Sequence, residues 1–343
     1  MAPIQNARVL FNSVPEKFPM PGGTTVYDTT QTIDLKTVPL DGGFLIKTLI
    51  LSVDQYFRNR MRKPEKKSFV PPFELGASIS GYGVGRVLRS ENSAVEVGKY
   101  VYGPEMLHQE YAVMKELGPA TVLEKHPDLP WTVYVGAAGM PGQTAFTGWK
   151  EYSDAKPGEV AFVTTGAGPV GSMVIQLAKQ AGLKVIASAG SEEKVKFMQS
   201  LGADVVFNYK TMDTREVLAK EGPIDIFWDN VGGDILDAAI EHAAIKARFL
   251  ECGSSSGYNN GHTPIKNMSM VSQKTLHIHG ILVFQLLPKY YKEFYGTIPA
   301  KLASEEIKYN EEVTNGLDKV EDVILAVQKG TNRAKAVVVV AEE

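Results

Sequence analysis

From residue 160 onward, the chain alternates short apolar runs with glycine turns and helical patterns, and this alternation restricts the possible folds most strongly. The apolar runs fall at 160–164, 185–189, 205–207, 224–228 and 249–252. Strands that alternate with helices pair in parallel, because each helix returns the chain to the same end of the sheet. The expected fold class is therefore α/β, with a doubly wound parallel sheet.

The loop after the first of these runs has the pattern of a dinucleotide-binding turn. Residues 166–171 read Gly-Ala-Gly-Pro-Val-Gly, which fits G-x-G-x-x-G between a strand and an apolar helix. Glycines there permit a tight turn and close backbone approach to a pyrophosphate, and the helix N-terminus adds free N–H groups. Pro169 suits a first helical turn, where its missing N–H costs little. An incidental glycine turn is the alternative, which the strand–loop–helix context disfavours.

The next strand end predicts which nicotinamide cofactor binds. A carboxylate at the tip of this strand would bind the 2′-hydroxyl of NAD. The strand at 185–189 has no acid at its tip, although Glu192 and Glu193 follow closely. Ser191 is a candidate helix cap, and Lys194 in the first helical turn places a cation where a 2′-phosphate would lie. This arrangement favours NADP(H), with a solvated helix lysine as the alternative.

The first third of the chain has a different sequence pattern. Short β-like runs at 44–51, 81–87 and 99–103 are divided by glycines, prolines and other turn residues, which is typical of a mostly antiparallel β-domain or partial barrel. The final run at 334–340 follows a predicted helix at 320–329 and could return to this first domain. A length of 343 residues also suggests two domains.

Composition excludes several classes of function. A formal charge of −3 indicates neither nucleic acid nor an anionic membrane as the main partner. No apolar run approaches the roughly 20 residues of a membrane span, and no secretory signal is visible. The single cysteine, Cys252, excludes an intrachain disulfide and removes the thiolates that zinc sites commonly use. The histidines show no metal-ligand spacing, so we expect a cytoplasmic protein without a metal.

Three further motifs carry a family resemblance that runs nearly end to end. Residues 52–58 read Ser-Val-Asp-Gln-Tyr-Phe-Arg, residues 139–146 read Gly-Met-Pro-Gly-Gln-Thr-Ala-Phe, and residues 229–233 read Asp-Asn-Val-Gly-Gly. With the glycine loop, they resemble the zinc-independent medium-chain dehydrogenases/reductases. More narrowly, they resemble the leukotriene B4 12-hydroxydehydrogenase/prostaglandin reductase and alkenal double-bond reductase group. Gln55 and Phe57 depart from the Pro and Met of the first motif, on the substrate side.

The resemblance implies a domain plan and an activity. The plan is a GroES-like, mostly antiparallel β-domain of residues 1–130 with 300–343, and a Rossmann dinucleotide-binding domain of residues 131–299. The active site would lie in the cleft between them. The implied activity is NADPH-dependent, metal-independent reduction of the carbon–carbon double bond of small α,β-unsaturated ketones or aldehydes, and the family also suggests a homodimer.

Carried over by position, the resemblance implies a set of cofactor-binding residues. Lys194 and Tyr209 would surround the adenosine 2′-phosphate, and Asn230 would lie near the nicotinamide ribose. Tyr209 and Asn230 could instead serve turns, and Asn332 could cap a helix. The implied pyrophosphate contacts are Gly168, Pro169, Val170 and Gly171. The implied nicotinamide-side contacts are Cys252, Gly253, Ser254, Tyr258, Ile281, Leu282 and Val283, and Asn332 would also contact the cofactor.

Tyr258 is the leading catalytic candidate. It follows a predicted strand at the carboxyl edge where ligands bind in such sheets, and the family places a catalytic tyrosine in this loop. A tyrosine hydroxyl can donate a hydrogen bond to a carbonyl oxygen that gains negative charge. Tyr56 is a second candidate, either as a hydrogen-bond donor to the substrate or as a residue that lines the substrate site. The alternative for Tyr56 is simple packing in the core. The remaining alternatives are a quinone reductase, an alcohol dehydrogenase or a non-catalytic NADPH-binding protein.

Overall fold

A computed structural model describes residues 3–343 of the chain, which form two compact units. The first unit comprises Met1–Gly136 and Glu311–Glu343, and the second comprises Ala137–Asn310. The boundary expected between residues 299 and 300 falls inside helix α9 (Val283–Ala303). That helix packs on α2 (Met140–Tyr152) and stays whole within the second unit, so the boundary lies beyond its end.

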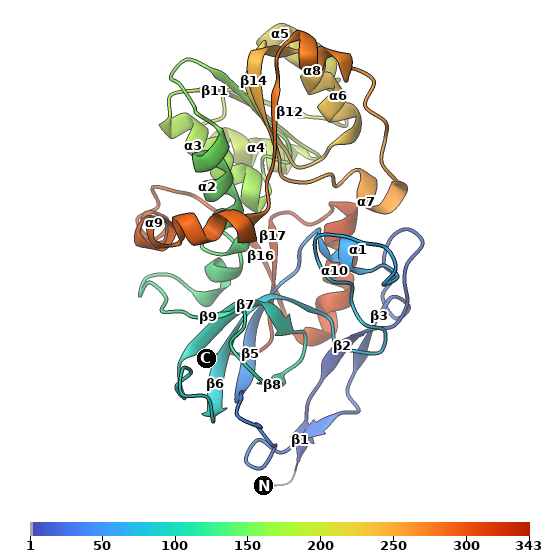
Figure 1. The fold of residues 1–343 in the computed structure, drawn as a ribbon, viewed down its shortest axis with the longest axis vertical. Helices are drawn as coiled ribbons and strands as arrows, with labels where there is room; N and C mark the ends of the chain where they lie inside the picture. Colours follow the sequence, from blue (N-terminus) through green and yellow to red (C-terminus); the bar gives the residue numbers. More distant parts are fainter. Residues whose placement is uncertain (1–2) are drawn as a thin grey trace. The chain divides into compact units, whose positions relative to one another are not determined.

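The first unit is built on a seven-stranded sheet, visible in the lower part of Figure 1. Its strand order is β16-β17-β5-β6-β7-β9, with β8 also paired to β5, and only the β16–β17 pair is parallel. The sheet strands are β5 (Phe44–Ser52), β6 (Ser80–Ser90), β7 (Tyr100–Leu107), β8 (Tyr111–Met114), β9 (Thr121–Val122), β16 (Glu311–Asn315) and β17 (Lys335–Val339).

Strand β17 confirms that the end of the chain returns to the first unit. It pairs antiparallel with β5, with Val337 opposite Ser52 and Val339 opposite Ile50. It follows helix α10 (Val320–Lys329), which ends at Gly330 in the left-handed conformation that glycine adopts without a steric penalty. The expected mostly antiparallel β-domain is therefore present.

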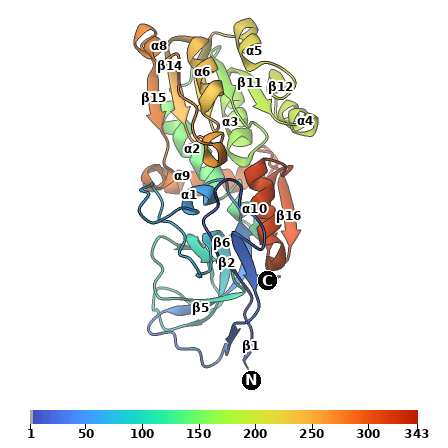
Figure 2. The ribbon, with the colours of Figure 1, turned by 90° about the vertical axis from the view of Figure 1, so that its right-hand side faces the viewer.

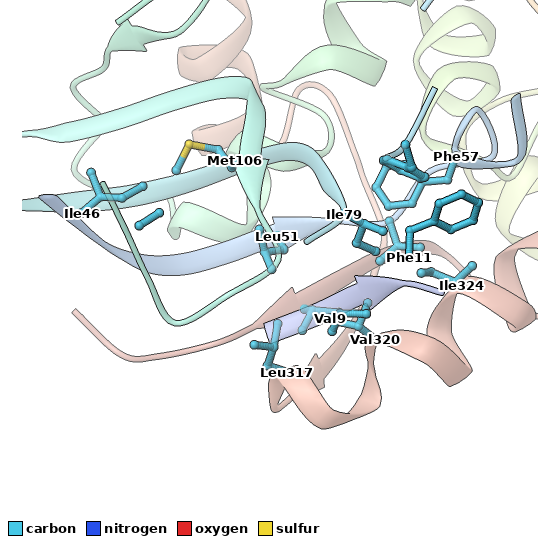
Figure 3. Packing of buried hydrophobic residues seen from close by; sticks show 14 of the residues in the cluster. Val9, Phe11, Ile46, Leu51, Phe57, Ile79, Met106, Leu317, Val320 and Ile324 are labelled. Carbon is cyan, nitrogen blue, oxygen red and sulfur yellow. The ribbon is translucent and has the colours of Figure 1, made fainter. Parts of the chain in front are cut away.

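The remaining elements of the first unit complete its core. Leu317, Val320 and Ile324, from η2 and α10, lie beside Val9 and Phe11 of β2 (Figure 3). Apolar residues from the two ends of the chain thus share one core. These other elements are β1 (Ile4–Gln5), β2 (Arg8–Phe11), β3 (Thr25–Asp28), β4 (Thr32–Ile33), α1 (Phe57–Arg60), η1 (Trp131–Val135) and η2 (Leu317–Lys319).

The second unit contains the expected doubly wound parallel sheet. Its order is β12-β11-β10-β13-β14-β15, and every neighbouring pair is parallel. Figure 2 shows this sheet from β15 at one edge to β12 at the other. The order reverses between β10 and β13, the kind of position where such sheets bind ligands. The strands are β10 (Val160–Val163), β11 (Lys184–Ala189), β12 (Val205–Asn208), β13 (Ile224–Asp229), β14 (Ala243–Glu251) and β15 (His277–Gly280).

Helices cover both faces of this sheet. Figure 1 shows α2 and α3 on one face, and α5, α6 and α8 on the other. Side chains of α2 and α9 contact each other. The ring centroids of Phe146 and Phe294 lie 5.6 Å apart, and the Gln143 side-chain amide donates a hydrogen bond to the Tyr295 hydroxyl at 2.8 Å. The other helices are α3 (Pro169–Gln180), α4 (Glu192–Ser200), α5 (Thr214–Glu221), α6 (Gly233–Glu241), α7 (Gly257–Asn260) and α8 (Ser269–Gln273).

Candidate active site

The glycine loop closes tightly against the end of β10. Gly168 donates its N–H to the Thr165 carbonyl at 2.8 Å and is the N-cap residue of α3, which begins at Pro169. A Cβ on Gly171 would stand 2.6 Å from that same carbonyl oxygen, so a side chain at this position would collide with backbone. Gly168, Pro169 and Val170 are half-buried at the helix N-terminus, where free N–H groups and the helix dipole favour an anion.

The ends of β11 and β12 form a corner beside this loop. The prediction that Ser191 caps α4 is confirmed, since its hydroxyl accepts from the Lys194 N–H at 3.4 Å. Tyr209 follows β12, and its hydroxyl lies 2.9 Å from the position of a Cβ on Gly190. Tyr209 is 42% exposed, and Glu192 is occupied by a hydrogen bond from Asn208. The corner therefore brings an aromatic hydroxyl to a glycine, and a half-buried lysine lies in the first turn of the helix that follows.

Lys210 is a further residue of this corner that the sequence analysis did not select. Its Cε lies 3.2 Å from the position of a Cβ on Gly190, at the tip of β11. The signal available in the sequence was its position directly after Tyr209. Because β11 and β12 are parallel neighbours, the residues that follow both strands meet at one sheet edge.

Asn230 lies at the end of β13 and is held by the end of β10. Its side-chain amide donates to the Thr164 carbonyl at 2.8 Å, and its backbone N–H donates to the Thr164 hydroxyl at 2.8 Å. Its side-chain oxygen also accepts from the indole of Trp228 at 3.3 Å. Asn230 thus has a structural role in the turn, and it is located at the carboxyl edge of the sheet.

The loop after β14 is tied to the same turn. Cys252 and Gly253 donate their N–H groups to the Asp229 carbonyl at 2.8 and 3.1 Å. Further along, the Tyr258 hydroxyl in α7 accepts from the Ser254 N–H at 3.4 Å. Tyr258 is half-buried and its ring folds back over the loop that precedes it.

The segment after β15 completes this edge of the second unit. Ile281 donates its N–H to the Glu251 carbonyl at 2.9 Å and is 5% exposed. Leu282 and Val283 follow at the start of α9 and are half-buried. The structure therefore brings the predicted residues from 168 to 283 to the carboxyl ends of one set of parallel strands.

Tyr56 and Asn332 belong to the first unit. Tyr56 directly precedes α1 and packs edge-to-face on Phe57, with ring centroids 5.3 Å apart. Burial, then nearby Asp54 and Tyr82, raise the pKa of Tyr56 well above its usual value, so its hydroxyl keeps its proton. Asn332 lies between α10 and β17 and donates to the Ala334 carbonyl at 2.7 Å.

The basic segment around α1 has a structural role. Arg60 donates to the carbonyls of Pro71 and Ser80, and Arg62 donates to the carbonyls of Asn59, Lys66 and Val70. These hydrogen bonds from two guanidinium groups to backbone carbonyls hold the loop that follows α1.

Two carboxyl groups lie side by side at the sheet edge, and the sequence analysis did not select either. Asp229 ends β13 and Glu251 ends β14, and they are register partners. Burial and the neighbouring Asp229 charge raise the pKa of Glu251 to about 9. Burial, with Asp229 and Glu251 close by, also raises the pKa of the Cys252 thiol to about 12, which makes it a poor nucleophile.

Comparison with known proteins gives the family. Residues 20–122 match the family model described as the N-terminal domain of oxidoreductase, and residues 169–299 match the one described as zinc-binding dehydrogenase. The chain is 35% identical to the NADP(+)-dependent 2-alkenal reductase of Nicotiana tabacum, over 99% of both chains. It is 34% identical to prostaglandin reductase 1 of Bos taurus, over 91% of this chain and 95% of that protein.

A solved structure agrees over the whole fold. The crystal structure of CurA from Vibrio vulnificus in complex with NADPH is 30% identical, with a TM-score of 0.88, and the match covers 98% of this chain and 100% of that one. The chain belongs to the double-bond reductase group of the medium-chain dehydrogenases/reductases. This medium-chain reductase thus combines the Rossmann and GroES-like folds that its motifs predicted.

The word zinc in the second family description does not fit the residues of this medium-chain reductase. Cys252 is its single cysteine, and the pKa of the thiol is raised, whereas zinc takes the thiolate. Across residues 3–343, no three His, Cys, Asp or Glu side chains gather where one metal ion could bind them. None of the helices in the same range is both long and apolar enough to span a membrane.

Proposed function

We propose that this chain catalyses the NADPH-dependent reduction of the carbon–carbon double bond of α,β-unsaturated ketones or aldehydes. The observation that carries the proposal is the 35% identity, over 99% of both chains, with a relative named 2-alkenal reductase. The layout of polar groups at the carboxyl edge of the parallel sheet supports it, because that edge is where such folds bind nucleotides.

The glycine loop fits the pyrophosphate of the cofactor. Gly171 packs the start of α3 tightly against the loop, and Gly168, the second glycine of the motif, leaves the backbone without a side chain where a diphosphate approaches. Gly168, Pro169, Val170 and Gly171 bind the pyrophosphate, with the N-terminus of α3 supplying the N–H groups.

The corner at the ends of β11 and β12 fits a 2′-phosphate. Lys210 offers positive charge and Tyr209 offers a hydroxyl near Gly190, and Lys194 adds a second cation in the first turn of α4. The Glu192 carboxylate accepts a hydrogen bond from Asn208, so it is not available at the tip of β11 to bind a 2′-hydroxyl. These residues therefore select NADPH over NADH.

The remaining cofactor contacts follow the sheet edge. Asn230 binds the nicotinamide ribose, and Asn332 of the first unit binds the cofactor through its amide. The residues on the nicotinamide side are Cys252, Gly253, Ser254, Tyr258, Ile281, Leu282 and Val283. When bound, NADPH supplies the hydride that the substrate β-carbon accepts.

Tyr258 acts on the substrate carbonyl. As the β-carbon accepts the hydride, negative charge develops on the carbonyl oxygen as an enolate, and a proton taken up at the α-carbon then completes the saturated product. A hydrogen bond from the Tyr258 hydroxyl stabilises that charge, and one such donor is typically worth about 10²–10³ in kcat. Tyr56 keeps its hydroxyl proton and lines the substrate side.

One assay tests the reaction class. The loss of NADPH absorbance is followed with a simple enone as substrate, and the product is identified. The assay is repeated with NADH in place of NADPH, and again with NADPH after the protein has been treated with a chelator. The proposal predicts a saturated ketone formed with NADPH and unaffected by the chelator. A hydroquinone from a quinone, or an allylic alcohol from the enone, would instead assign the chain to the quinone-reductase or alcohol-dehydrogenase alternatives.

The family suggests a homodimeric assembly. We propose a homodimer in the cytoplasm, and size-exclusion chromatography with light scattering tests the dimer. A mass of about 37 kDa, the value for one chain, would contradict it.

A further inference from the structure

Asp229 is the centre of the turn that carries Asn230. Its carboxylate accepts N–H groups from Val231 and Gly232, at 2.8 to 3.0 Å, and it is fully buried. Its backbone carbonyl accepts from Cys252 and Gly253. Asp229 therefore joins two loops, one after β13 and one after β14, that the proposed function assigns to the cofactor.

Glu251 is placed directly against this carboxylate. The parallel pairing of β13 and β14 puts Glu251 opposite Asp229, and their carboxyl groups are hydrogen-bonded to each other. The Oε1 atom of Glu251 is buried and has no hydrogen-bond partner. A hydrogen bond between two carboxyl groups requires one proton, because two carboxylates are both acceptors.

The hydrogen bonds decide which group holds the proton. Burial raises the pKa of Asp229 to about 6, but backbone N–H groups donate to both of its oxygens and favour its ionised form. Glu251 lacks such donors, and burial together with the Asp229 charge raises its pKa. Glu251 is then the acid and Asp229 the carboxylate at neutral pH.

Among the described residues 3–343, no cation affects the pKa of Glu251, so a second negative charge beside Asp229 would lack a counter-ion. Cys252 is the neighbour of Glu251 along the chain, and its thiol keeps its proton. On β15 the register partner of Glu251 is Gly280, which has no side chain. His279 is paired with Leu250 and stacks on Tyr152 of α2, and its pKa is lowered by burial and by His277.

We propose that Glu251 is a positioning residue that keeps its carboxyl proton, donates a hydrogen bond to Asp229 through it, and thereby holds the two cofactor loops together. Loss of that proton would place two negative charges in contact at the end of adjacent strands. The repulsion would loosen the turn at Asn230 and the loop from Cys252, and it would weaken cofactor binding. This inference rests on the proposed function only in naming NADPH as the ligand.

The first test compares NADPH binding by the wild type and Glu251→Gln from pH 6 to pH 10. Glutamine keeps a donor to Asp229 but cannot ionise, so the two proteins should bind NADPH with dissociation constants within about twofold at pH 7. Above pH 8 the wild-type constant should rise, by about tenfold at pH 10, while that of Glu251→Gln stays nearly flat. Identical pH profiles for the two proteins would overturn the proposal.

The second test needs no cofactor. Infrared spectra of the apoprotein should show the carbonyl stretch of a protonated carboxylic acid at pH 7 that disappears in Glu251→Gln. Glu311 is the matched control, because burial raises its pKa too but it lies in the first unit. Glu311→Gln should leave the Glu251 band and the pH profile of NADPH binding unchanged. Absence of a band lost specifically in Glu251→Gln would also overturn the proposal.

A third variant separates the hydrogen bond from the charge. Glu251→Leu removes both, so it should weaken NADPH binding at every pH without a pH-dependent step. Binding as tight as that of Glu251→Gln at pH 7 would show that the donor to Asp229 contributes nothing. If no protein bound NADPH at any pH, the proposed function would fail, while the infrared test of the shared proton would still stand.

Discussion

Gly171 lies so close to Thr165 that a Cβ at position 171 would stand 2.6 Å from the Thr165 carbonyl oxygen. The same Cβ would come within 2.8 Å of the Cα of Gly166. Both neighbours are backbone atoms of a turn and cannot move aside as a flexible side chain would. The third glycine of the motif is therefore required for packing α3 against its own loop, before any ligand is considered.

Gly171→Ala should destabilise the second unit much more than Gly168→Ala does. A Cβ on Gly168 would have its nearest neighbour at 3.2 Å, and its backbone angles suit alanine. We expect Gly171→Ala to lower the free energy of unfolding by about 1–3 kcal/mol, as overpacking typically does. Gly168→Ala should mainly weaken NADPH binding. Denaturant unfolding and NADPH titration measure the two effects, and equal unfolding midpoints would contradict the expected contrast.

Tyr258→Phe should lower kcat for enone reduction by about 10²-fold, because it removes one donor to the developing oxyanion. The dissociation constant for NADPH should change little, since the ring remains. Steady-state kinetics and a binding titration measure both quantities. Tyr290→Phe is the control, because that hydroxyl donates to Glu151 between α9 and α2. Unchanged turnover in Tyr258→Phe would remove Tyr258 from the mechanism.

Lys194→Ala should raise the KM for NADPH about tenfold and leave the KM for NADH nearly unchanged. A hydrogen bond to a charged group contributes about 1.5–3 kcal/mol, and NADH lacks the 2′-phosphate. Lys210→Ala should act in the same direction, because Lys210 approaches Gly190. Lys196→Ala, on the exposed face of α4, is the control. Equal effects on both cofactors would reject the 2′-phosphate assignment.

Glu251→Gln should change how stability depends on pH. The raised pKa means that the folded chain holds a proton that the unfolded chain releases between its ordinary pKa and about 9. The stabilisation from that proton is complete below the ordinary pKa and is lost as the pH rises towards 9. Relative to the wild type, Glu251→Gln should therefore gain up to about 5 kcal/mol in its free energy of unfolding between pH 5 and pH 9. Denaturant unfolding at pH 5 and at pH 9 measures this difference. An equal change in the free energy of unfolding of the two proteins between these pH values would contradict the prediction.

Lys335→Met should strongly destabilise the first unit. The Lys335 ammonium lies 2.9 Å from Asp54, and the two side chains are 3% and 10% exposed. Removing one partner of a buried pair leaves an uncompensated charge, at a cost of about 3–5 kcal/mol. Lys319 pairs with Asp318 at the same distance but at the surface, so Lys319→Met should change the unfolding midpoint little. Similar effects of both variants on thermal unfolding would contradict this reasoning.

Local sequence patterns predicted much of the secondary structure of this protein. Each strand of the nucleotide sheet up to β14, the turn at Gly168, the cap at Ser191 and the helix at 320–329 could be located from residues a few positions apart. These features depend on hydrophobic periodicity and on short-range backbone chemistry, which the sequence displays directly. The motifs that resemble the double-bond reductases added the family and the order of the two folds.

Contacts between distant segments were decided only by the tertiary structure. The Asp54–Lys335 pair joins residues 281 positions apart, and the pairing of β13 with β14 is what sets Glu251 against Asp229. Lys210 reaches Gly190 because two parallel strands end side by side. The sequence by itself determined those elements, the glycine loop and the expectation of NADPH as the cofactor. Strand order and burial, which arise from long-range packing, determined which ionisable groups meet and which of them hold a proton.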